Sequence, residues 1–239
     1  MVFQEPMKAL NPVLSIGYQV AESLKIHKSY THHQAQKEAS KILDRVGLPN
    51  KQFSRSIFPH QLSGGQRQRV VVAIAIACKP EIIIADEPTT SLDVTIQKQI
   101  LDLIYELVFE EKMSLILITH DLGVVAENTD HMMVMYAGRI VEKGQTKNVF
   151  NKLSHPYTRG LFESIPGYDN FKKGSFFNSG NHPKKRFATI PGRVPEFWER
   201  SKGCNFNERC SRAKYNCYSE VPNETQLCED HFTRCFYPY

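Results

Sequence analysis

Two short segments of branched apolar residues, with one amphipathic helix pattern between them, constrain the fold of this chain more than any other feature. The run IIIAD at 82–86 does not alternate between apolar and polar residues, which is typical of a strand covered on both faces in a parallel sheet. SLILITHD at 114–121 repeats this pattern, and between the two segments apolar residues recur at helical spacing from Ile100 to Val108. A strand, a helix and a strand in this order predict a βαβ unit and an α/β fold.

The composition excludes two classes of protein. Hydrophobic residues make up 41% of the 239 residues and charged residues 23%, and the net charge of +5 is too mild for a nucleic-acid-binding protein. The longest apolar stretch, VVVAIAIAC at 70–78, is too short to cross a bilayer and predicts a buried helix. The first residues do not form a signal-peptide pattern. We therefore expect a cytoplasmic protein that reaches a membrane only through a partner.

The character of the sequence changes near residue 150. Helical periodicity covers 14–48, and HMMVMYAGRIVEKG predicts two strands around a turn at Ala137–Gly138. Residues 167–187 are polar and aperiodic, which is typical of a linker, and the part from Ile190 is rich in cysteine and proline with little helix or strand signal. We predict one domain at 1–150 and a second at 151–239.

A serine and two glycines precede the apolar helix in LSGGQRQRV at 62–70. Ser63 is a typical helix N-cap, and the glycines let another group approach the backbone closely. Amides at a helix N-terminus, backed by the positive end of the helix dipole, can bind phosphate. Taken alone, these residues are more typical of a plain capped helix after a glycine turn.

Acidic residues and a histidine follow the two predicted strands. Asp86 and Glu87 end IIIADE, at the edge where open α/β sheets bind ligands. An aspartate there can hold Mg²⁺ through water, and a second carboxylate can orient or deprotonate an attacking water. His120 ends the next strand, at the same edge if the strands are parallel. Each feature alone is explained by solvated side chains, but together they predict a phosphate and magnesium site.

Several longer motifs carry a resemblance to a known family. LSGGQRQR, IIIADEP, TTSLD and LITHD resemble the nucleotide-binding subunits of ABC transporters. VFQEPMKALNP, HPYTRGLFESIP and IPGRVPEF resemble the dipeptide/oligopeptide (and nickel) importer ATPases within that family. The resemblance implies an ATPase that uses ATP and Mg²⁺, with a RecA-like P-loop NTPase sheet, a helical subdomain and a small cysteine-rich C-terminal tail domain. It also implies a place at the cytoplasmic face of the inner or plasma membrane. The implied partners are a second ATPase subunit, two transmembrane permease subunits and, indirectly, an extracytoplasmic peptide-binding protein.

The resemblance assigns a role to each matching position. Gln4 matches the Q-loop glutamine, which senses Mg²⁺ and nucleotide. Asp86 matches the Walker B carboxylate that holds Mg²⁺, Glu87 the general base, and His120 the switch histidine at the γ-phosphate. Asp93 matches the D-loop at the dimer seam. The signature loop, which closes over ATP held by the opposite subunit, corresponds to Ser63, Gly64, Gly65 and Gln66.

One motif of the family does not occur in these 239 residues. The Walker A pattern G-x-x-x-x-G-K-[ST] is missing from the sequence, although in the family it precedes the Q-loop by several tens of residues. The chain thus resembles roughly the C-terminal two-thirds of a subunit, and we expect an incomplete sheet. Without a central strand its neighbours expose backbone groups and apolar faces. We expect the isolated chain to be poorly stable and not to hydrolyse ATP by itself.

Five of the six cysteines follow residue 203, and the first three are spaced C-x₅-C-x₆-C. This spacing indicates metal binding but leaves zinc, an iron–sulfur cluster and buried structural thiols open. In the importer ATPases the tail pattern resembles one that binds a [4Fe–4S] cluster, with a fourth ligand in an H-x₃-C segment. The ligands implied by the resemblance are Cys204, Cys210, Cys217 and Cys235. Cys228 is then left over, and Cys78 is interpreted as packing within the apolar helix.

Three functions stay open at this point. The first is the energy-coupling subunit of an importer for dipeptides, oligopeptides or nickel, as one piece of a split gene or a truncated copy. The second is a non-catalytic remnant that at most binds partners. The third, an ABC ATPase of repair or translation, is disfavoured by the tail and by VFQEPMKALNP. Because Asp86, Glu87 and His120 are all in place, the first interpretation is favoured.

Overall fold

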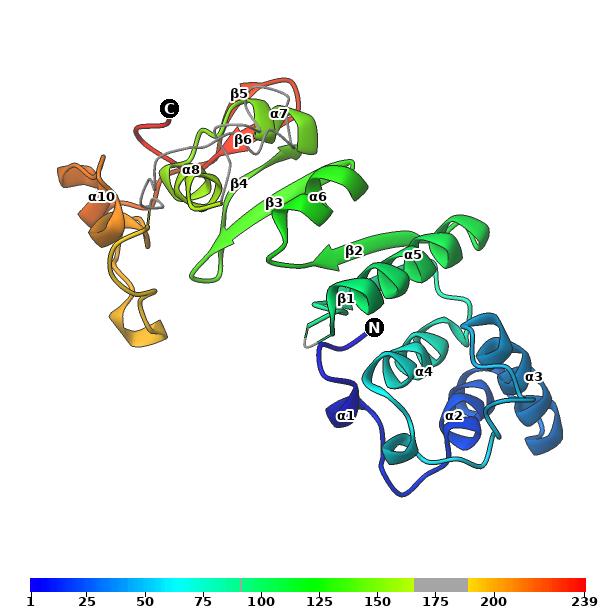
Figure 1. Cartoon of the computed structure of the whole chain (residues 1–239). Helices are drawn as coiled ribbons and strands as arrows, with labels where there is room; N and C mark the ends of the chain where they lie inside the picture. The colour runs from blue at the N-terminus through cyan, green and yellow to red at the C-terminus, as the bar shows by residue number, and fades with distance from the viewer. Residues whose placement is uncertain (91, 166–188) are drawn as a thin grey trace, which may run out of the picture. The chain divides into compact units, whose positions relative to one another are not determined.

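A parallel pair of strands forms the first sheet of the computed structural model (Figure 1). β1 (Ile82–Asp86) pairs with β2 (Ser114–Ile118), so that Asp86 lies opposite Ile118, and α5 (Val94–Glu110) connects the two strands. The predicted βαβ unit is therefore confirmed. The structure describes residues 1–90, 92–165 and 189–239.

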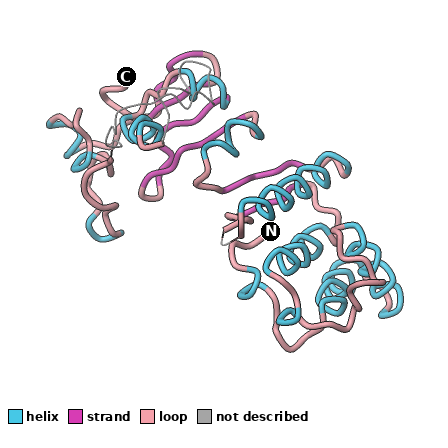
Figure 2. Tube along the Cα trace, viewed as in Figure 1, coloured by secondary structure: helices cyan, strands magenta, loops and turns pink. Residues whose placement is uncertain are grey.

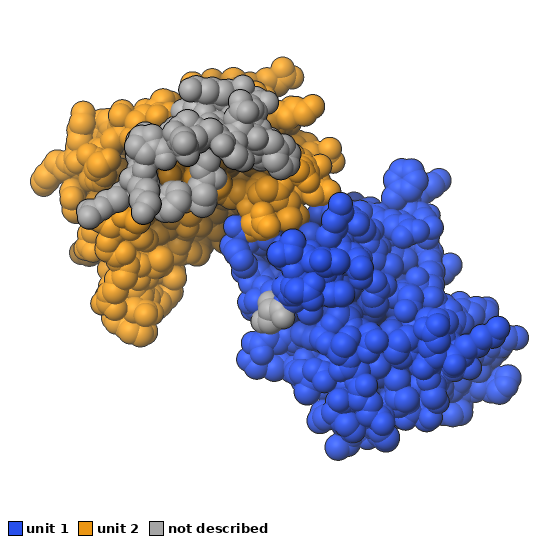
Figure 3. Space-filling model, viewed as in Figure 1, with its two compact units in different colours: residues 1–120 blue, residues 121–239 orange. Residues whose placement is uncertain are grey.

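Residues 1–120 form one compact unit (Figure 3), in which helices pack on one face of this sheet. The helical periodicity predicted over 14–48 is confirmed as α2 (Ile16–Lys28) and α3 (His32–Arg45), and the apolar helix after the glycines is α4 (Gly64–Ile76) (Figure 2). The two short helices of this unit are α1 (Pro6–Ala9) and η1 (Pro59–Gln61). Val2 adds a single parallel bridge to Ala85 of β1. The backbone before Gln4 is thereby fixed beside the end of β1.

The opposite face of this sheet differs from the prediction. Ile83 and Ala85 are buried, at 2% and 0% exposure, as a covered strand requires. Ile82 and Ile118 on the other face are 54% and 46% exposed. The prediction of a strand covered on both faces is therefore wrong for the described residues, because the helices of residues 1–120 pack on the face that holds Ile83 and Ala85.

Residues 121–239 form a second compact unit around an antiparallel sheet of order β3-β4-β6-β5. The hairpin predicted around Ala137–Gly138 is confirmed, and both turn residues have positive φ, 45° and 78°, as a two-residue hairpin turn of type I′ requires. The elements of this unit are α6 (Leu122–Asn128), β3 (His131–Tyr136), β4 (Arg139–Gln145), α7 (Thr146–Asn151), α8 (Pro156–Glu163), η2 (Phe197–Glu199), η3 (Asn207–Arg209), α10 (Tyr215–Ser219), β5 (Thr225–Cys228) and β6 (His231–Thr233). The compact units meet in sequence at 120/121, and the boundary near residue 150 stays a prediction.

Two details of the sequence interpretation are corrected. The tail, for which we expected little regular structure, supplies β5 and β6, and β6 pairs antiparallel with β4 through Thr233 and His231. These strands are so short that their own sequences carry a weak signal, and the existing edge of β4 supplies their hydrogen-bonding partners. Cys78 lies in the turn after α4, which ends at Ile76.

The predicted linker at 167–187 lies outside the described residues. Among the helices of the described ranges, none combines the length and the apolar character that a bilayer-spanning helix needs.

Candidate functional site

Glu87 is the centre of a hydrogen-bonded group at the carboxyl end of the parallel strands. Its Oε2 accepts from Nε2 of Gln4 at 2.6 Å and from Oγ1 of Thr90 at 2.8 Å. Its Oε1 lies 3.1 Å from Nδ1 of His120. The main-chain amide of Glu87 donates to the carbonyl of Ile118, so the residue is attached to both strands. The structure thus brings together Gln4, Glu87 and His120, which are far apart in sequence.

These contacts determine the charge of the group. Hydrogen bonds from Thr90 and then from His120, with a smaller contribution from Gln4, hold the pKa of Glu87 below its usual value. An ionised carboxylate only accepts hydrogen bonds, so Nδ1 of His120 carries the proton of that bond and Nε2 is left for another partner. The His120 side chain is 78% exposed and that of Glu87 26% exposed. Both therefore remain accessible to a ligand.

Ser63 occupies the N-cap of α4, as predicted. Its Oγ accepts from the amide of Gln66 at 3.3 Å, and the side chain of Gln66 accepts from the amide of Ser63 at 2.8 Å. This reciprocal capping box satisfies two of the free amides at the helix start. Ser63 and Gly64 are exposed, so the end of the helix is open to a partner.

The two glycines after Ser63, Gly64 and Gly65, lie against the start of α5. A Cβ on Gly65 would stand 2.6 Å from Cγ2 of Ile96, and one on Gly64 would stand 3.2 Å from Cδ2 of Leu92. The group that approaches these glycines in this structure is therefore a side chain of the same unit. Asp93, the N-cap of α5, accepts from the amide of Ile96 at 3.0 Å. The starts of α4 and α5 thus form one surface.

Apart from the four cysteines, the predicted site residues fall into two groups in the described residues. Gln4, Glu87 and His120 form one, with Asp86 immediately before Glu87 at the end of β1. The second group consists of Ser63 to Gln66 at the start of α4 and Asp93 at the start of α5. The hydrogen bonds of Ser63 and Asp93 cap their own helices and do not connect them to Glu87.

Two residues of the site were missed by the sequence analysis. Thr90, three residues after Glu87, donates a hydrogen bond to its carboxylate. A hydroxyl residue three positions after an acid is a local pattern that could have indicated this contact. Gln68, on the second turn of α4, donates to the main-chain carbonyl of Phe3 at 3.3 Å. Nothing in its own sequence neighbourhood indicates that contact, because Phe3 is 65 residues away.

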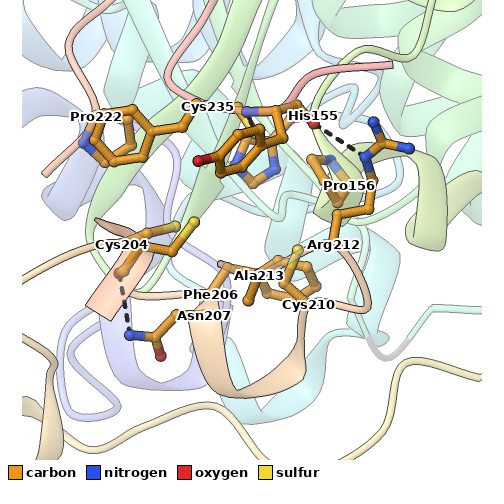
Figure 4. Close-up of a pocket in the computed structure, with 13 residues that line it drawn as sticks. His155, Pro156, Cys204, Phe206, Asn207, Cys210, Arg212, Ala213, Pro222 and Cys235 are labelled. Carbon is orange, nitrogen blue, oxygen red and sulfur yellow. Dashed lines mark hydrogen bonds between the residues drawn. The ribbon is translucent and has the colours of Figure 1, made fainter. Parts of the chain in front are cut away.

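The four cysteines of the predicted cluster line one small cavity in residues 121–239 (Figure 4). Its volume is about 10 Å³, enough for about one water molecule. The amide of Cys204 donates to the carbonyl of Cys217 at 2.8 Å, and Asn207 donates to the same carbonyl at 3.2 Å. Cys235 reaches the cavity from the segment after β6, whereas Cys228 lies on β5 and is exposed.

Burial disfavours the charged thiolate at three of the cysteines that line this cavity, Cys204, Cys210 and Cys235. It raises the pKa of Cys204 and Cys210, and it raises the pKa of Cys235 to about 11. Within the described residues no three His, Cys, Asp or Glu side chains are arranged to hold a single metal ion. The cavity is lined by four thiols together with His155, Phe206 and Tyr237.

Two known protein families match separate parts of the chain. Residues 1–90 match the family described as ABC transporter, and residues 141–217 match the one described as oligopeptide/dipeptide transporter, C-terminal region. The dipeptide transport ATP-binding protein DppD of Escherichia coli (strain K12) is 42% identical over 238 residues, which cover 100% of this chain and 69% of that protein. The putative peptide import ATP-binding protein BAB2_0817 of Brucella abortus (strain 2308) is 47% identical over 235 residues, covering 98% of this chain and 68% of that protein.

Solved structures with a similar fold come from the same class of protein. The cbiO1 protein from Clostridium perfringens, part of the ABC transporter complex cbiONQ, aligns with a TM-score of 0.54 and 30% identity over 63% of this chain and 58% of that one. The ATP-binding cassette MJ0796, solved as a dimer in a post-hydrolysis state with ADP and Pi, aligns with a TM-score of 0.52 and 29% identity over 61% of each chain. The fold is that of an α/β ABC ATPase. The chain therefore belongs to the ATP-binding proteins of ABC transporters, in the family of dipeptide and oligopeptide transporters.

Proposed function

We propose that this protein is the energy-coupling subunit of an importer for dipeptides or oligopeptides, and that it hydrolyses ATP at an interface between two ATPase subunits. The observation that carries the proposal is the convergence of Gln4 and His120 on the carboxylate of Glu87. The names of its relatives favour peptides as the solute. Nickel is the alternative solute, and the solute itself binds to other subunits.

The roles of the residues follow from their chemistry. Glu87 is ionised at neutral pH, so it accepts a hydrogen bond from the attacking water and orients it. Asp86 and Gln4 would hold Mg²⁺, and Nε2 of His120 would donate to the γ-phosphate when both ring nitrogens carry a proton. The Walker A pattern does not occur in these 239 residues, and the partner subunit's nucleotide would meet the start of α4 at Ser63.

The experiment is an ATPase and transport assay of the protein assembled with its second ATPase subunit and membrane subunits in lipid vesicles. Glu87→Gln keeps the size of the side chain and removes the carboxylate, so kcat should fall about 10²–10⁴-fold while MgATP affinity is unchanged. Glu81→Gln, at an exposed position before β1, is the matched control and should keep full activity. Wild-type complex without peptide-stimulated turnover would favour the alternative, a non-catalytic remnant.

A second proposal concerns the cysteine cavity, because Cys204, Cys210, Cys217 and Cys235 line the same space. We infer that these four thiols hold a [4Fe–4S] cluster that stabilises the loop-rich tail. In a four-iron cluster each iron would take one thiolate. Four thiols around one space therefore suit a cluster better than they suit a single metal ion.

Anaerobic reconstitution with iron and sulfide tests this proposal. We expect bound iron and sulfide with a cluster absorption spectrum, a higher unfolding temperature, and loss of all three in Cys217→Ser. Cys228→Ser, at the exposed cysteine, is the matched control and should bind the cluster normally. A protein that stays free of iron, or a Cys228→Ser variant that fails as Cys217→Ser does, would contradict it.

A further inference from the structure

Gln68 is a buried polar side chain that the proposed catalytic roles do not use. It is 1% exposed on the inner face of α4, five residues after the signature serine. Its Nε2 donates to the main-chain carbonyl of Phe3 at 3.3 Å. Because a carbonyl only accepts, the amide nitrogen must face Phe3, and this fixes the orientation of the whole side-chain amide.

That orientation leaves the other end of the amide without a partner. Oε1 of Gln68 is buried and makes no hydrogen bond to any described residue. An unpaired buried oxygen is unfavourable, and an apolar side chain of equal length would avoid it. Packing alone therefore does not explain a glutamine here. The contact that a glutamine makes and an apolar residue cannot make is the one to Phe3.

The contacted carbonyl precedes the catalytic glutamine directly. Val2 is fixed by main-chain hydrogen bonds to Ile84 and Asp86, and Phe3 is held by Gln68. The next residue, Gln4, is exposed and reaches Glu87 at 2.6 Å. The carbonyl of Phe3 belongs to the peptide unit whose nitrogen is that of Gln4, so a bond to that carbonyl restrains the backbone from which the Gln4 side chain extends.

We propose that Gln68 is a positioning residue that connects the signature helix to the Q-loop glutamine, and so to Glu87. The proposal rests on the proposed ATPase function. A shift of α4, caused by a ligand at Ser63, then moves the peptide unit before Gln4 and changes its hydrogen bond to Glu87. The path runs through one helix and one main-chain carbonyl, and all of it lies in residues 1–120.

The first test uses the full chain and does not need activity. The side-chain amide of Gln4 is observed by NMR with and without the substitution Glu87→Gln. In the otherwise wild-type chain this substitution should shift the amide resonances of Gln4, because the two side chains are hydrogen-bonded. Gln68→Met keeps length and packing but cannot donate, and it should abolish that response. Gln99→Met, at an exposed glutamine on α5, is the matched control and should retain it. An unchanged response in Gln68→Met would overturn the proposal, and hydrogen exchange of the α5 amides shows whether each variant is folded.

The second test is a double-mutant cycle in the assembled transporter. Gln68→Met should lower kcat about tenfold with an unchanged KM for MgATP, since misplacement of a positioned group affects the chemical step. The double variant Gln4→Ala/Gln68→Met should be no slower than Gln4→Ala alone, because Gln68 acts through Gln4. Additive losses would overturn the proposal. If the wild-type complex has no ATPase activity, the proposed function fails, whereas the NMR result still decides the role of Gln68.

Discussion

Glu142 and His231 are hydrogen-bonded at 2.8 Å across 89 residues of sequence, and neither side chain is exposed. The same carboxylate accepts from the main-chain amides of Ser154 at 2.8 Å and His155 at 2.9 Å. One buried acid therefore joins β4, β6 and the start of α8. The cysteine-rich tail is attached to the unit through this cluster as well as through strand pairing.

The buried cluster predicts a large loss of stability in Glu142→Ala. The change leaves two main-chain amides and the ring of His231 without their acceptor, and breaking a buried pair typically costs about 3–5 kcal/mol. We expect that decrease in the free energy of unfolding, measured by hydrogen exchange of the β4 and β6 amides in urea. Glu229→Ala, at an exposed glutamate, should change it little. Equal losses in both variants would show that the hydrogen bonds of Glu142 make no specific contribution to the free energy of unfolding.

His155 predicts a pH dependence of the second unit. Burial lowers its pKa from 6.5 to about 4, and its Nδ1 accepts from the amide of Tyr157, which requires the neutral ring. Because the unfolded chain binds the proton more readily, stability is complete above about pH 6.5 and falls as pH decreases toward 4, by about 3 kcal/mol in all. Unfolding of residues 121–239 measured at several pH values checks this.

His155→Gln should flatten that profile, whereas His33→Gln, at an exposed histidine, should leave it intact. A profile that keeps its slope in His155→Gln would mean that another group is responsible.

The contact between Gly65 and Ile96 predicts overpacking in Gly65→Ala. The new Cβ would lie 2.6 Å from Cγ2 of Ile96, so α4 or α5 has to shift, at about 1–3 kcal/mol. Gly64→Ala meets Leu92 at 3.2 Å and should be milder. Thermal unfolding of Gly65→Ala/Ile96→Ala should show less than the sum of the two single losses, because the second change removes the clashing methyl. Additivity would contradict this explanation.

The hydrogen bond from Thr90 to Glu87 leads to a prediction about the pKa of that carboxyl. This hydrogen bond is the largest cause of the lowered pKa of Glu87, so Thr90→Val should raise that pKa. A lowered carboxyl pKa stabilises the fold above the unfolded pKa and this contribution is lost as pH falls through the folded pKa. Thr90→Val should therefore shrink the contribution. Carboxyl-carbon NMR titration measures the change, with Thr89→Val as control.

The exposed sheet face predicts self-association of the isolated 239-residue chain. Ile82, Ile84, Ile116 and Ile118 are between 36% and 54% exposed on adjacent strands, and such a patch is prone to aggregate. Ile116→Thr/Ile118→Thr should reduce the association constant in sedimentation experiments. An unchanged association constant would mean that the chains associate through a surface other than this face of the sheet.

The agreement between sequence and structure has an identifiable basis at Glu87. The motif IIIADEP predicted a strand followed by two acids, and SLILITHD predicted a neighbouring strand followed by His120. Because parallel strands end at one edge, the meeting of Glu87 with His120 could be inferred from spacing alone. The hydrogen bond from Thr90 was also within reach, since three residues separate it from Glu87.

The long-range contacts were not predictable in the same way. Gln68 and Phe3 are 65 residues apart, and Glu142 and His231 are 89 apart, so no local pattern relates them. The strand β6 is only three residues long and forms against β4. Ile82 has the pattern of a covered strand, but its exposure depends on what packs on that face.

By itself the sequence determined the βαβ unit, the capped start of α4 and the order of the acidic and histidine residues along the sheet edge, because apolar periodicity and capping chemistry act over a few residues. The tertiary structure alone decided that Gln68 holds the carbonyl before Gln4 and that Glu142 ties the tail to β4. These contacts join residues distant in sequence, and only the packing of complete elements brings them within hydrogen-bonding range.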